Sequence, residues 1–186
     1  MIGYCLCGSF CTFEESFSVL KNLKDTYKEI LPIMSYNAYS TDTRFGNSAE
    51  WIGKIEGLCD RKIINTIKDA EPLGPKISLD ALVIAPCTGN TLAKLANGIT
   101  DTPVCMAAKA HLRSDRPLVI ALASNDAMSA NLGNIATLLS RKNIYFVPMV
   151  QDEPIKKPHS LVADFAQLEK TLENALLGKQ IRKLFI

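Results

Sequence analysis

The chain has 186 residues, of which 47% are hydrophobic and 22% are charged, and its 21 basic and 19 acidic side chains give a net charge of +2. These are the values of an ordinary globular protein, and they exclude collagen-like and disordered chains. The basic residues are interspersed with acidic ones, so we expect no nucleic-acid partner. The length predicts a single domain over residues 1–186.

The apolar segments are all shorter than the roughly 20 residues that a membrane-spanning helix requires, so no membrane partner is expected. Residues 1–7 have no basic region before their apolar run, and we interpret them as a first strand instead of a signal peptide. A cytoplasmic location with six reduced cysteines follows. A zinc site formed by Cys5, Cys7 and Cys11 is the weaker alternative to buried thiols, and we expect no metal.

The first half of the chain alternates between strands and helices. In chain order the predicted elements are a strand over 2–7, a helix over 12–27, a strand over 29–34, a helix over 48–69 and a rigid connector over 71–76. Thr12 is the predicted N-cap of the first helix, with Glu15 completing a capping box. The connector contains two prolines and a glycine, which stop a helix.

The second half continues the alternation. Its predicted elements are a strand over 80–86, a helix ending at Gly98, a helix capped by Thr100 or Asp101 and running to 113, a strand over 118–123, a helix through 128–139, a strand over 144–147, a polar loop over 151–160 and a helix over 161–183. The strand over 80–86 lacks polar alternation, which is typical of a parallel strand covered on both faces. The sequence therefore predicts an α/β fold, a Rossmann-like doubly wound parallel sheet in three α/β/α layers, without fixing the strand order.

Small hydrogen-bonding residues gather directly after four predicted strands. The segments are Gly8–Ser9, Ser35–Asn37, Pro86–Thr91 and Ser124–Asp126. Ligands of open α/β sheets bind at the carboxyl ends of the strands, where helix N-termini favour anions. Each loop alone also reads as a turn or a helix cap, and Glu14 and Glu15 would repel an anion from the first helix. Together the four loops predict one ligand site.

The standard dinucleotide and P-loop fingerprints are absent from the sequence. The two histidines also have no obvious catalytic partner. His111 lies near a predicted helix end, and we interpret it as a surface cation, while His159 falls in the polar loop. A serine or cysteine nucleophile activated by histidine is therefore poorly supported.

The segment Val83–Asp101 resembles the signature of the homo-oligomeric flavin-containing flavoproteins, which include cysteine decarboxylases and flavin prenyltransferases. The resemblance implies FMN at the strand ends and assembly into trimers or multiples of trimers. Carried over by position, the implied FMN-binding residues are Gly8, Ser9 and Ser35 at the phosphate, Pro86, Cys87, Thr88, Asn90 and Thr91 along the flavin ring and substrate, and Ser124, Asn125 and Met128 closing the site. The catalytic residues are unknown, with Cys87 and Asn90 as weak candidates.

The chain departs from the decarboxylases in two places. Residues 74–80 contain no histidine, and residues 122–128 replace the Pro-x-Met-Asn motif, so decarboxylation of a cysteinyl substrate is not expected. Residues 70–76, 99–113 and 151–158 instead resemble the branch of this family formed by the B subunits of dipicolinate synthases in spore-forming bacteria.

That resemblance implies an oxidoreductase subunit that works with a dinucleotide-binding A subunit as its partner. The small dicarboxylate substrate, a dihydrodipicolinate-type precursor, would be oxidised to pyridine-2,6-dicarboxylate. Candidate ligands for its carboxylates are Arg44, Lys94, Lys109 and Arg113. Two alternatives stay open, a flavin prenyltransferase and a non-catalytic flavin-binding scaffold.

Overall fold

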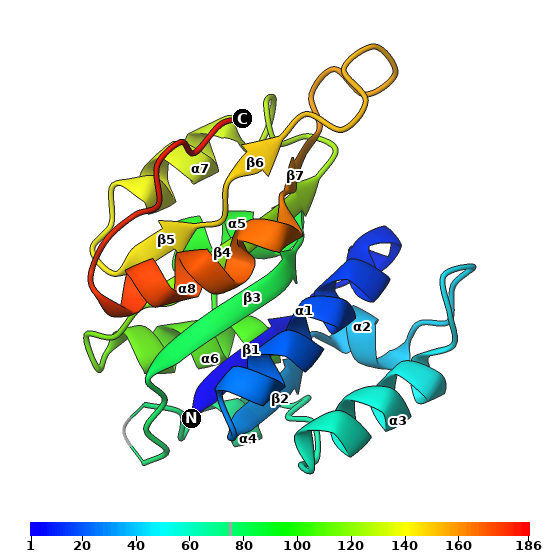
Figure 1. Cartoon of the computed structure of the whole chain (residues 1–186), viewed down its shortest axis with the longest axis vertical. Coiled ribbons are helices and arrows are strands. Elements are labelled where there is room, and N and C mark those ends of the chain that lie inside the picture. The colour runs from blue at the N-terminus through cyan, green and yellow to red at the C-terminus, as the bar shows by residue number, and fades with distance from the viewer. Residues whose placement is uncertain (75) are drawn as a thin grey trace.

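The computed structural model describes residues 1–74 and 76–186, and within them a seven-stranded sheet lies between two layers of helices (Figure 1). The strands are β1 Ile2–Leu6, β2 Ile30–Met34, β3 Ala81–Cys87, β4 Leu118–Ser124, β5 Ile144–Phe146, β6 Met149–Val150 and β7 Leu161–Ala163. Every residue of β1, β2 and β3 is buried, because helices cover both faces of the sheet.

Strands β1 to β5 are parallel and follow the order β2-β1-β3-β4-β5. The first half of β4 pairs with β5, while its last two residues, Ala123 and Ser124, pair with the antiparallel β7. The chain proceeds from β1 outward to β2 and then returns to the other side of β1 for β3, so β1 and β3 flank a topological switch point. The predicted Rossmann-like architecture is confirmed, with the antiparallel β6 and β7 as an unpredicted addition.

Two helical layers cover the sheet. The helices are α1 Phe13–Thr26, α2 Tyr36–Ser40, α3 Ser48–Cys59, α4 Ile67–Ala70, α5 Gly89–Ala96, α6 Pro103–Leu112, α7 Leu132–Leu139 and α8 Leu168–Leu176, with 3-10 turns η1 Phe10–Thr12 and η2 Phe165–Gln167. Tyr4 and Leu6 of β1 pack with α1, α3 and α8 in one core layer. Cys5 and Cys7 face the opposite layer, with α4, α5, α6 and α7. Figure 1 shows α1 and α8 in front of the sheet and α6 behind it.

The first helix begins where the sequence predicts, but the capping box is wrong. Thr12 is the N-cap of α1, yet its side chain accepts no capping hydrogen bond. Thr12 is also the last residue of η1, and its hydroxyl donates instead to the carbonyl of Ser9 at 2.9 Å. Glu15 is therefore left exposed in the first turn, where it complements the helix dipole.

The helix predicted over 48–69 is divided in the structure. Helix α3 ends because Asp60 adopts a left-handed conformation at φ 53°. Ile64 then lies along the outer edge of β2, donating to Pro32 O at 3.0 Å and accepting from Met34 N at 2.9 Å. Thr66 caps the short α4 that follows. The connector predicted over 71–76 includes residue 75, which lies outside the described residues.

The helix predicted over 161–183 is also wrong at both its start and its end. Residues 161–163 form β7, and the helix proper, α8, spans Leu168–Leu176. Residues 177–186 then return along the strands as a tail. In this tail Leu184 O accepts from Met149 N at 2.8 Å, and Ile186 N donates to Met149 O at 3.1 Å.

The second half departs from the predictions at three smaller points. The helix predicted through 128–139 begins only at Leu132, as α7. Helix α6 is capped by Thr102, whose hydroxyl accepts from Cys105 N at 3.2 Å, because Asp101 is paired with Lys94 instead. His111 is fully buried, so its interpretation as a surface cation is wrong. Gly98 follows α5 at φ +70°, as predicted for a helix C-terminus.

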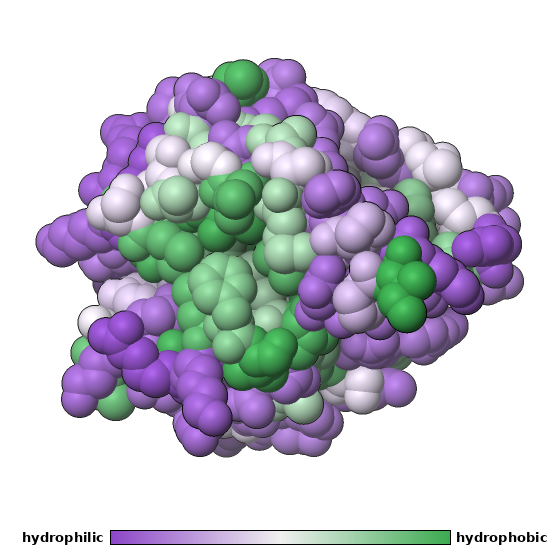
Figure 2. All heavy atoms as spheres, turned by 90° about the horizontal axis from the view of Figure 1, so that it is seen from above, coloured by the Kyte–Doolittle hydropathy of each residue, from purple (hydrophilic) through white to green (hydrophobic). Residues whose placement is uncertain are grey.

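The surface seen from above has an apolar area bordered by hydrophilic residues (Figure 2). Helix α7 and the C-terminal tail, at the upper end of Figure 1, expose Leu132, Phe185 and Ile186. Within residues 1–74 and 76–186, none of the helices combines the length and apolar character needed to cross a membrane.

Candidate functional site

The four polar loops meet at the carboxyl ends of β1 to β4, where they line two adjoining cavities of about 580 Å³ and 340 Å³. Three residues, Gly8, Thr88 and Asn90, line both cavities, so the two form one continuous site. Parallel strands bring the loops together, since their carboxyl ends share one edge of the sheet. The site lies at the switch point between β1 and β3.

The smaller cavity is lined mainly by hydroxyl and amide groups. Its residues are Gly8, Ser35, Tyr36, Asn37, Thr88, Asn90, Thr91, Lys94, Asp101 and Thr102. Ser35 caps α2, where its hydroxyl oxygen accepts from Ala38 N at 3.3 Å. Lys94 contacts both carboxylate oxygens of Asp101 at 2.8 and 2.9 Å, which neutralises its charge. This cavity therefore offers neutral donors suited to phosphate or hydroxyl oxygens.

The larger cavity combines polar loops with aromatic and charged side chains. Its residues are Gly8, Ser9, Phe10, Cys11, Arg44, Phe45, Thr88, Gly89, Asn90, Ala123, Ser124, Asn125, Asp126, Asp152, Lys157 and Val162. Two long loops, 41–47 and 151–160, contribute the charged residues on its outer side. In Figure 1 both loops stand on the right, beyond the ends of the strands.

Helix α5 directs its N-terminus into both cavities. Its N-cap, Thr88, accepts from Thr91 N at 3.2 Å. The amides of Gly89 and Asn90 belong to the first turn and have no intrahelical acceptor. The first turn of α5 contains no acidic residue, in contrast to α1 with Glu14 and Glu15. The positive end of the α5 dipole is thus available to an anionic or electron-rich ligand.

A carboxylate braces the junction between β4 and α5. Asp126 Oδ1 accepts from the hydroxyl of Ser124 and from Asn131 Nδ2, the latter at 2.9 Å. The Ser124 hydroxyl holds the pKa of the Asp126 carboxyl below its ordinary value. A Cβ atom on Gly89 would lie 2.6 Å from Asn131 Nδ2 and 2.8 Å from Asp126 Oδ1. This contact requires glycine at the first position of α5.

The structure brings eight of the eleven predicted site residues to the two cavities, namely Gly8, Ser9, Ser35, Thr88, Asn90, Thr91, Ser124 and Asn125. Pro86 and Cys87 are instead buried within β3, and Met128 packs against the core. Burial raises the pKa of the Cys87 thiol well above its ordinary value. The thiol of Cys87 therefore lies behind the site in its protonated form.

Several lining residues were not predicted from the sequence. Phe10, Phe45 and Lys157 reach the larger cavity, and Thr102 reaches the smaller one. The polar loop over 151–160 was recognised, but nothing in its composition indicates that it folds over this edge. Of the four predicted carboxylate ligands, Arg44 and Lys94 line the site.

Lys109 and Arg113 line a different cavity of about 410 Å³, together with Leu95, Ile99 and Arg141. The Arg141 guanidinium contributes there by donating to the carbonyls of Leu95 and Ala96 at 3.1 and 2.6 Å, which closes the C-terminal end of α5. These cations therefore lie away from the four strand-end loops.

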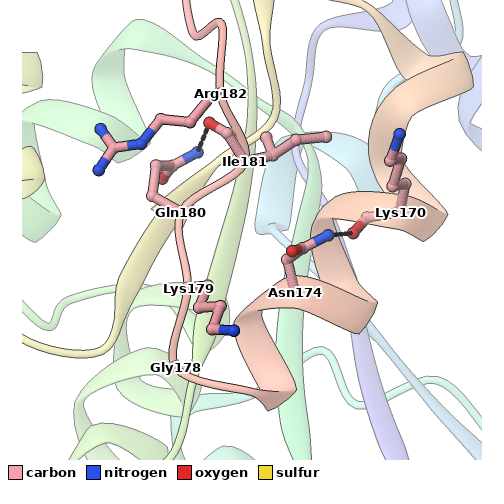
Figure 3. A pocket seen from close by; sticks show the side chains of 7 residues that line it. All are labelled: Lys170, Asn174, Gly178, Lys179, Gln180, Ile181 and Arg182. Atoms are coloured by element: carbon pink, nitrogen blue, oxygen red, sulfur yellow. Dashed lines mark hydrogen bonds between the residues drawn. The ribbon is translucent and has the colours of Figure 1, made fainter.

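A further cavity of about 530 Å³ lies between α8 and the C-terminal tail (Figure 3). Lys170, Lys179 and Arg182 line it, but their side chains point in different directions and do not converge on one point. None of the four polar loops contributes to it. Among the described residues there is also no cluster of three or more His, Cys, Asp or Glu side chains that could hold a metal ion.

Comparisons with known proteins agree with this architecture. A family model described as Flavoprotein matches residues 1–171. The B subunit of dipicolinate synthase from Bacillus subtilis (strain 168) is 48% identical over 185 residues, covering 100% of this chain and 92% of the relative. The crystal structure of the corresponding B subunit from Bacillus halodurans has a TM-score of 0.91 at 44% identity, covering 100% of this chain and 95% of that chain. An FMN-dependent cysteine decarboxylase has a TM-score of 0.71 at 26% identity, over 95% of this chain and 94% of that chain.

Proposed function

Because the chain belongs to the flavoprotein family, as the resemblance in its sequence predicted, we propose that it is an FMN-binding subunit of a dipicolinate-forming enzyme. In this role it helps to oxidise a dihydrodipicolinate-type precursor to pyridine-2,6-dicarboxylate. The similarity to the B subunits of dipicolinate synthases extends over the whole chain, which supports this activity over that of other flavoproteins.

The observation that carries the proposal is the meeting of four strand-end loops at two adjoining cavities. The donors there fit FMN. Ser35 and Thr102 offer hydroxyls in the smaller cavity, where a phosphate and its ribityl chain need donors, because each hydroxyl accepts a capping bond and keeps its own proton free. The larger cavity, of about 580 Å³, offers the free amides at the start of α5 to the polar edge of the flavin ring.

Gly8 supports this fit at the junction of the two cavities. A Cβ atom there would lie in ordinary contact, 3.4 Å from the ring of Phe10 and 3.5 Å from Asn37 Cβ, so a methyl group is accommodated. Because Gly8 lines both cavities, we expect a branched side chain there to narrow the passage that an elongated ligand needs.

When bound, FMN supplies an acceptor for the hydride equivalent that a dihydro ring releases as it becomes aromatic. The residues of this chain bind and orient the two rings. Asn90 and Ser124 border the larger cavity from two neighbouring loops, and the Asp126 carboxylate fixes the Ser124 hydroxyl. We assign no step to the Cys87 thiol, because it is buried and protonated.

The proposal includes a dinucleotide-binding A subunit as the partner, since the relatives are named as B subunits. It also includes assembly of copies of this chain into trimers or multiples of trimers in the cytoplasm. A flavin-binding scaffold that only supports the partner is the second function to be tested.

The test is the visible spectrum of the protein after saturation with FMN and removal of free FMN. We expect about one flavin per chain in the native protein and none in Gly8→Val, because the valine side chain would block the passage at Gly8. Gly53→Ala is the matched control, since a Cβ at Gly53 meets no atom within 4 Å. A colourless native protein would overturn the flavin site.

The second stage measures dipicolinate formation by the native protein and by Asn90→Ala, each combined with the A subunit. We expect a catalytic site to lose activity in this variant, because the Asn90 side chain borders both cavities, and FMN content is measured in parallel to separate lost chemistry from lost cofactor. Full activity of Asn90→Ala and of the flavin-free protein would favour the scaffold. Prenylated flavin after incubation with dimethylallyl phosphate would identify a prenyltransferase instead.

A further inference from the structure

We propose that Arg44 is the anchor for a substrate carboxylate in the larger cavity, which makes that cavity a subsite for a planar ring bearing carboxylates. The inference rests on the proposed function, because it assigns the substrate end of the same site. Arg44 lines the larger cavity together with Thr88 and Asn90 of the strand-end loops.

The turn that presents Arg44 is held by several hydrogen bonds. Thr43 and Gly46 exchange two backbone hydrogen bonds of 3.1 Å, which leaves Arg44 and Phe45 at the tip. Phe45 N donates to Thr43 Oγ1 at 3.1 Å. Trp51 Nε1 donates to Phe45 O at 3.3 Å and ties the turn to α3. The turn is therefore a fixed element, although it lies at the surface.

Asp42, the nearest carboxylate in sequence, is committed to holding the turn. It accepts from Ser48 N and Ser48 Oγ, each at 2.8 Å, and from Asn47 Nδ2 at 3.3 Å. The Ser48 backbone amide and hydroxyl lower the pKa of Asp42 below its ordinary value. Asp42 thus stays ionised without pairing with Arg44.

The Arg44 guanidinium is held over the ring of Phe45, 4.8 Å from its centroid. Among the described residues no carboxylate lies within salt-bridge distance of it. The stacking leaves the N–H groups at the edge of the guanidinium plane available, and their fork matches a carboxylate in two parallel hydrogen bonds.

The other charges of the cavity are already compensated. Lys157 contacts Asp152 at 3.0 Å and Glu153 at 3.8 Å. Asp126 is stabilised by the Ser124 hydroxyl and the Asn131 amide. Among the described residues that line the larger cavity, Arg44 is accordingly the one cation without a carboxylate partner. Lys157 is a weaker second contact for a substrate carboxylate.

The walls of the subsite favour a flat ring. Phe10 and Phe45 both line it, and a planar ring packs favourably on aromatic side chains. An aromatic dicarboxylate such as pyridine-2,6-dicarboxylate matches both the rings and the cation. A simple aliphatic acid would match the cation alone.

The experiment is a titration of the FMN-loaded protein with pyridine-2,6-dicarboxylate in metal-free buffer, followed by calorimetry and by the flavin difference spectrum. We expect Arg44→Gln to weaken this binding by about tenfold to a hundredfold, the loss of a charged hydrogen-bonded pair. Arg44→Lys should restore part of the affinity, and Lys157→Gln should cost less than Arg44→Gln. Arg61→Gln is the matched control, because Arg61 pairs with Glu29 and lines neither cavity of the site.

FMN affinity is measured in parallel, and we expect it to be within twofold of the native value in Arg44→Gln. An unchanged dicarboxylate affinity in this variant would overturn the inference. So would a loss of FMN affinity alone, because Arg44 would then hold the cofactor phosphate. If the native protein retains no FMN, the proposed function fails separately, and calorimetry on the flavin-free protein still decides whether dicarboxylate binding depends on Arg44.

Discussion

Gly89 and Ser124 meet so closely across the ends of β3 and β4 that a Cβ atom on Gly89 would lie 2.5 Å from Ser124 Oγ. The contact joins the N-terminus of α5 to the Asp126 carboxylate, which accepts from the same hydroxyl. The position of α5, and thereby of its free amides, depends on the absence of a side chain at residue 89.

Gly89→Ala should destabilise the protein by about 1–3 kcal/mol, because the methyl group overpacks a junction of three polar atoms. It should also reduce flavin retention, since α5 must shift. The measurements are urea unfolding and the flavin content after desalting. Gly57→Ala is the control: its Cβ meets nothing within 4 Å, and alanine should stabilise α3 by about 0.5–1 kcal/mol. Equal stability of the two variants would contradict the proposed contact.

Because of the buried His111, we expect the free energy of unfolding to decrease in mild acid. Its Nε2 lies 2.9 Å from Pro117 O, so Nε2 carries the proton, and Nδ1 has no partner among the described residues. Burial lowers the pKa of His111 below its ordinary 6.5, which the Pro117 carbonyl only partly opposes. Below pH 6.5 the unfolded chain therefore takes up a proton at this histidine that the folded chain resists. As the pH decreases, the free energy of unfolding decreases by up to about 1.4 kcal/mol per pH unit.

Urea unfolding between pH 7.5 and pH 5 measures this loss. His111→Gln should show a shallower decline than the native protein, while His159→Gln, in the exposed loop, should keep the native slope. Parallel curves for the native protein and His111→Gln would exclude His111 as the source.

The cysteines should differ sharply in reactivity at pH 8. Cys11 is exposed, whereas the other five are buried. Burial raises the pKa of Cys7 to about 12 and that of Cys59 to about 11, so their reactive thiolates are scarce. Iodoacetamide should add one group per native chain and six per denatured chain, as mass spectrometry counts them. Cys11→Ser should abolish the native adduct, and rapid labelling of Cys87 would argue for an accessible thiol at the site.

Tyr4 should contribute to stability through its hydroxyl. The hydroxyl is fully buried and lies 2.9 Å from both Ser16 O and Ser16 Oγ, while Ser16 Oγ donates to Ala85 O at 2.6 Å. Tyr4→Phe should cost about 1–3 kcal/mol, because it removes the hydroxyl that hydrogen-bonds to the buried Ser16. Tyr36→Phe, whose residue is 46% exposed, should stay within about 0.5 kcal/mol of the native protein in the same unfolding assay.

Local patterns in the sequence were sufficient to predict the parallel strands and the strand-end loops. The strand predicted over 80–86 lies at Ala81–Cys87, because an unbroken apolar run next to a glycine-containing loop has few other interpretations. The convergence of Gly8, Thr88 and Ser124 follows from parallel topology alone. The strands and their following loops could be predicted because each is determined by residues close together in the sequence.

The errors arise where distant contacts decide the structure. Leu161 and Phe165 have helical spacing with later leucines, but Leu161 pairs with Ser124 and belongs to a strand. His111 has the polarity of a surface residue, and only the carbonyl of Pro117 makes its burial tolerable. Arg44 resembles any exposed arginine until the folded turn brings it to the larger cavity.

The tail that returns along β6 has a consequence for assembly. Its bonds to Met149 occupy backbone groups of β6, and Gln180 bonds both backbone groups of Phe146 in β5. Ile64 occupies the far edge of the sheet at β2, where Pro32 has no N–H to offer. These bonds occupy part of each margin, which disfavours strand addition from another chain and edge-to-edge aggregation. In the proposed assembly, copies of this chain would therefore associate through helices and loops, leaving the sheet of each copy separate.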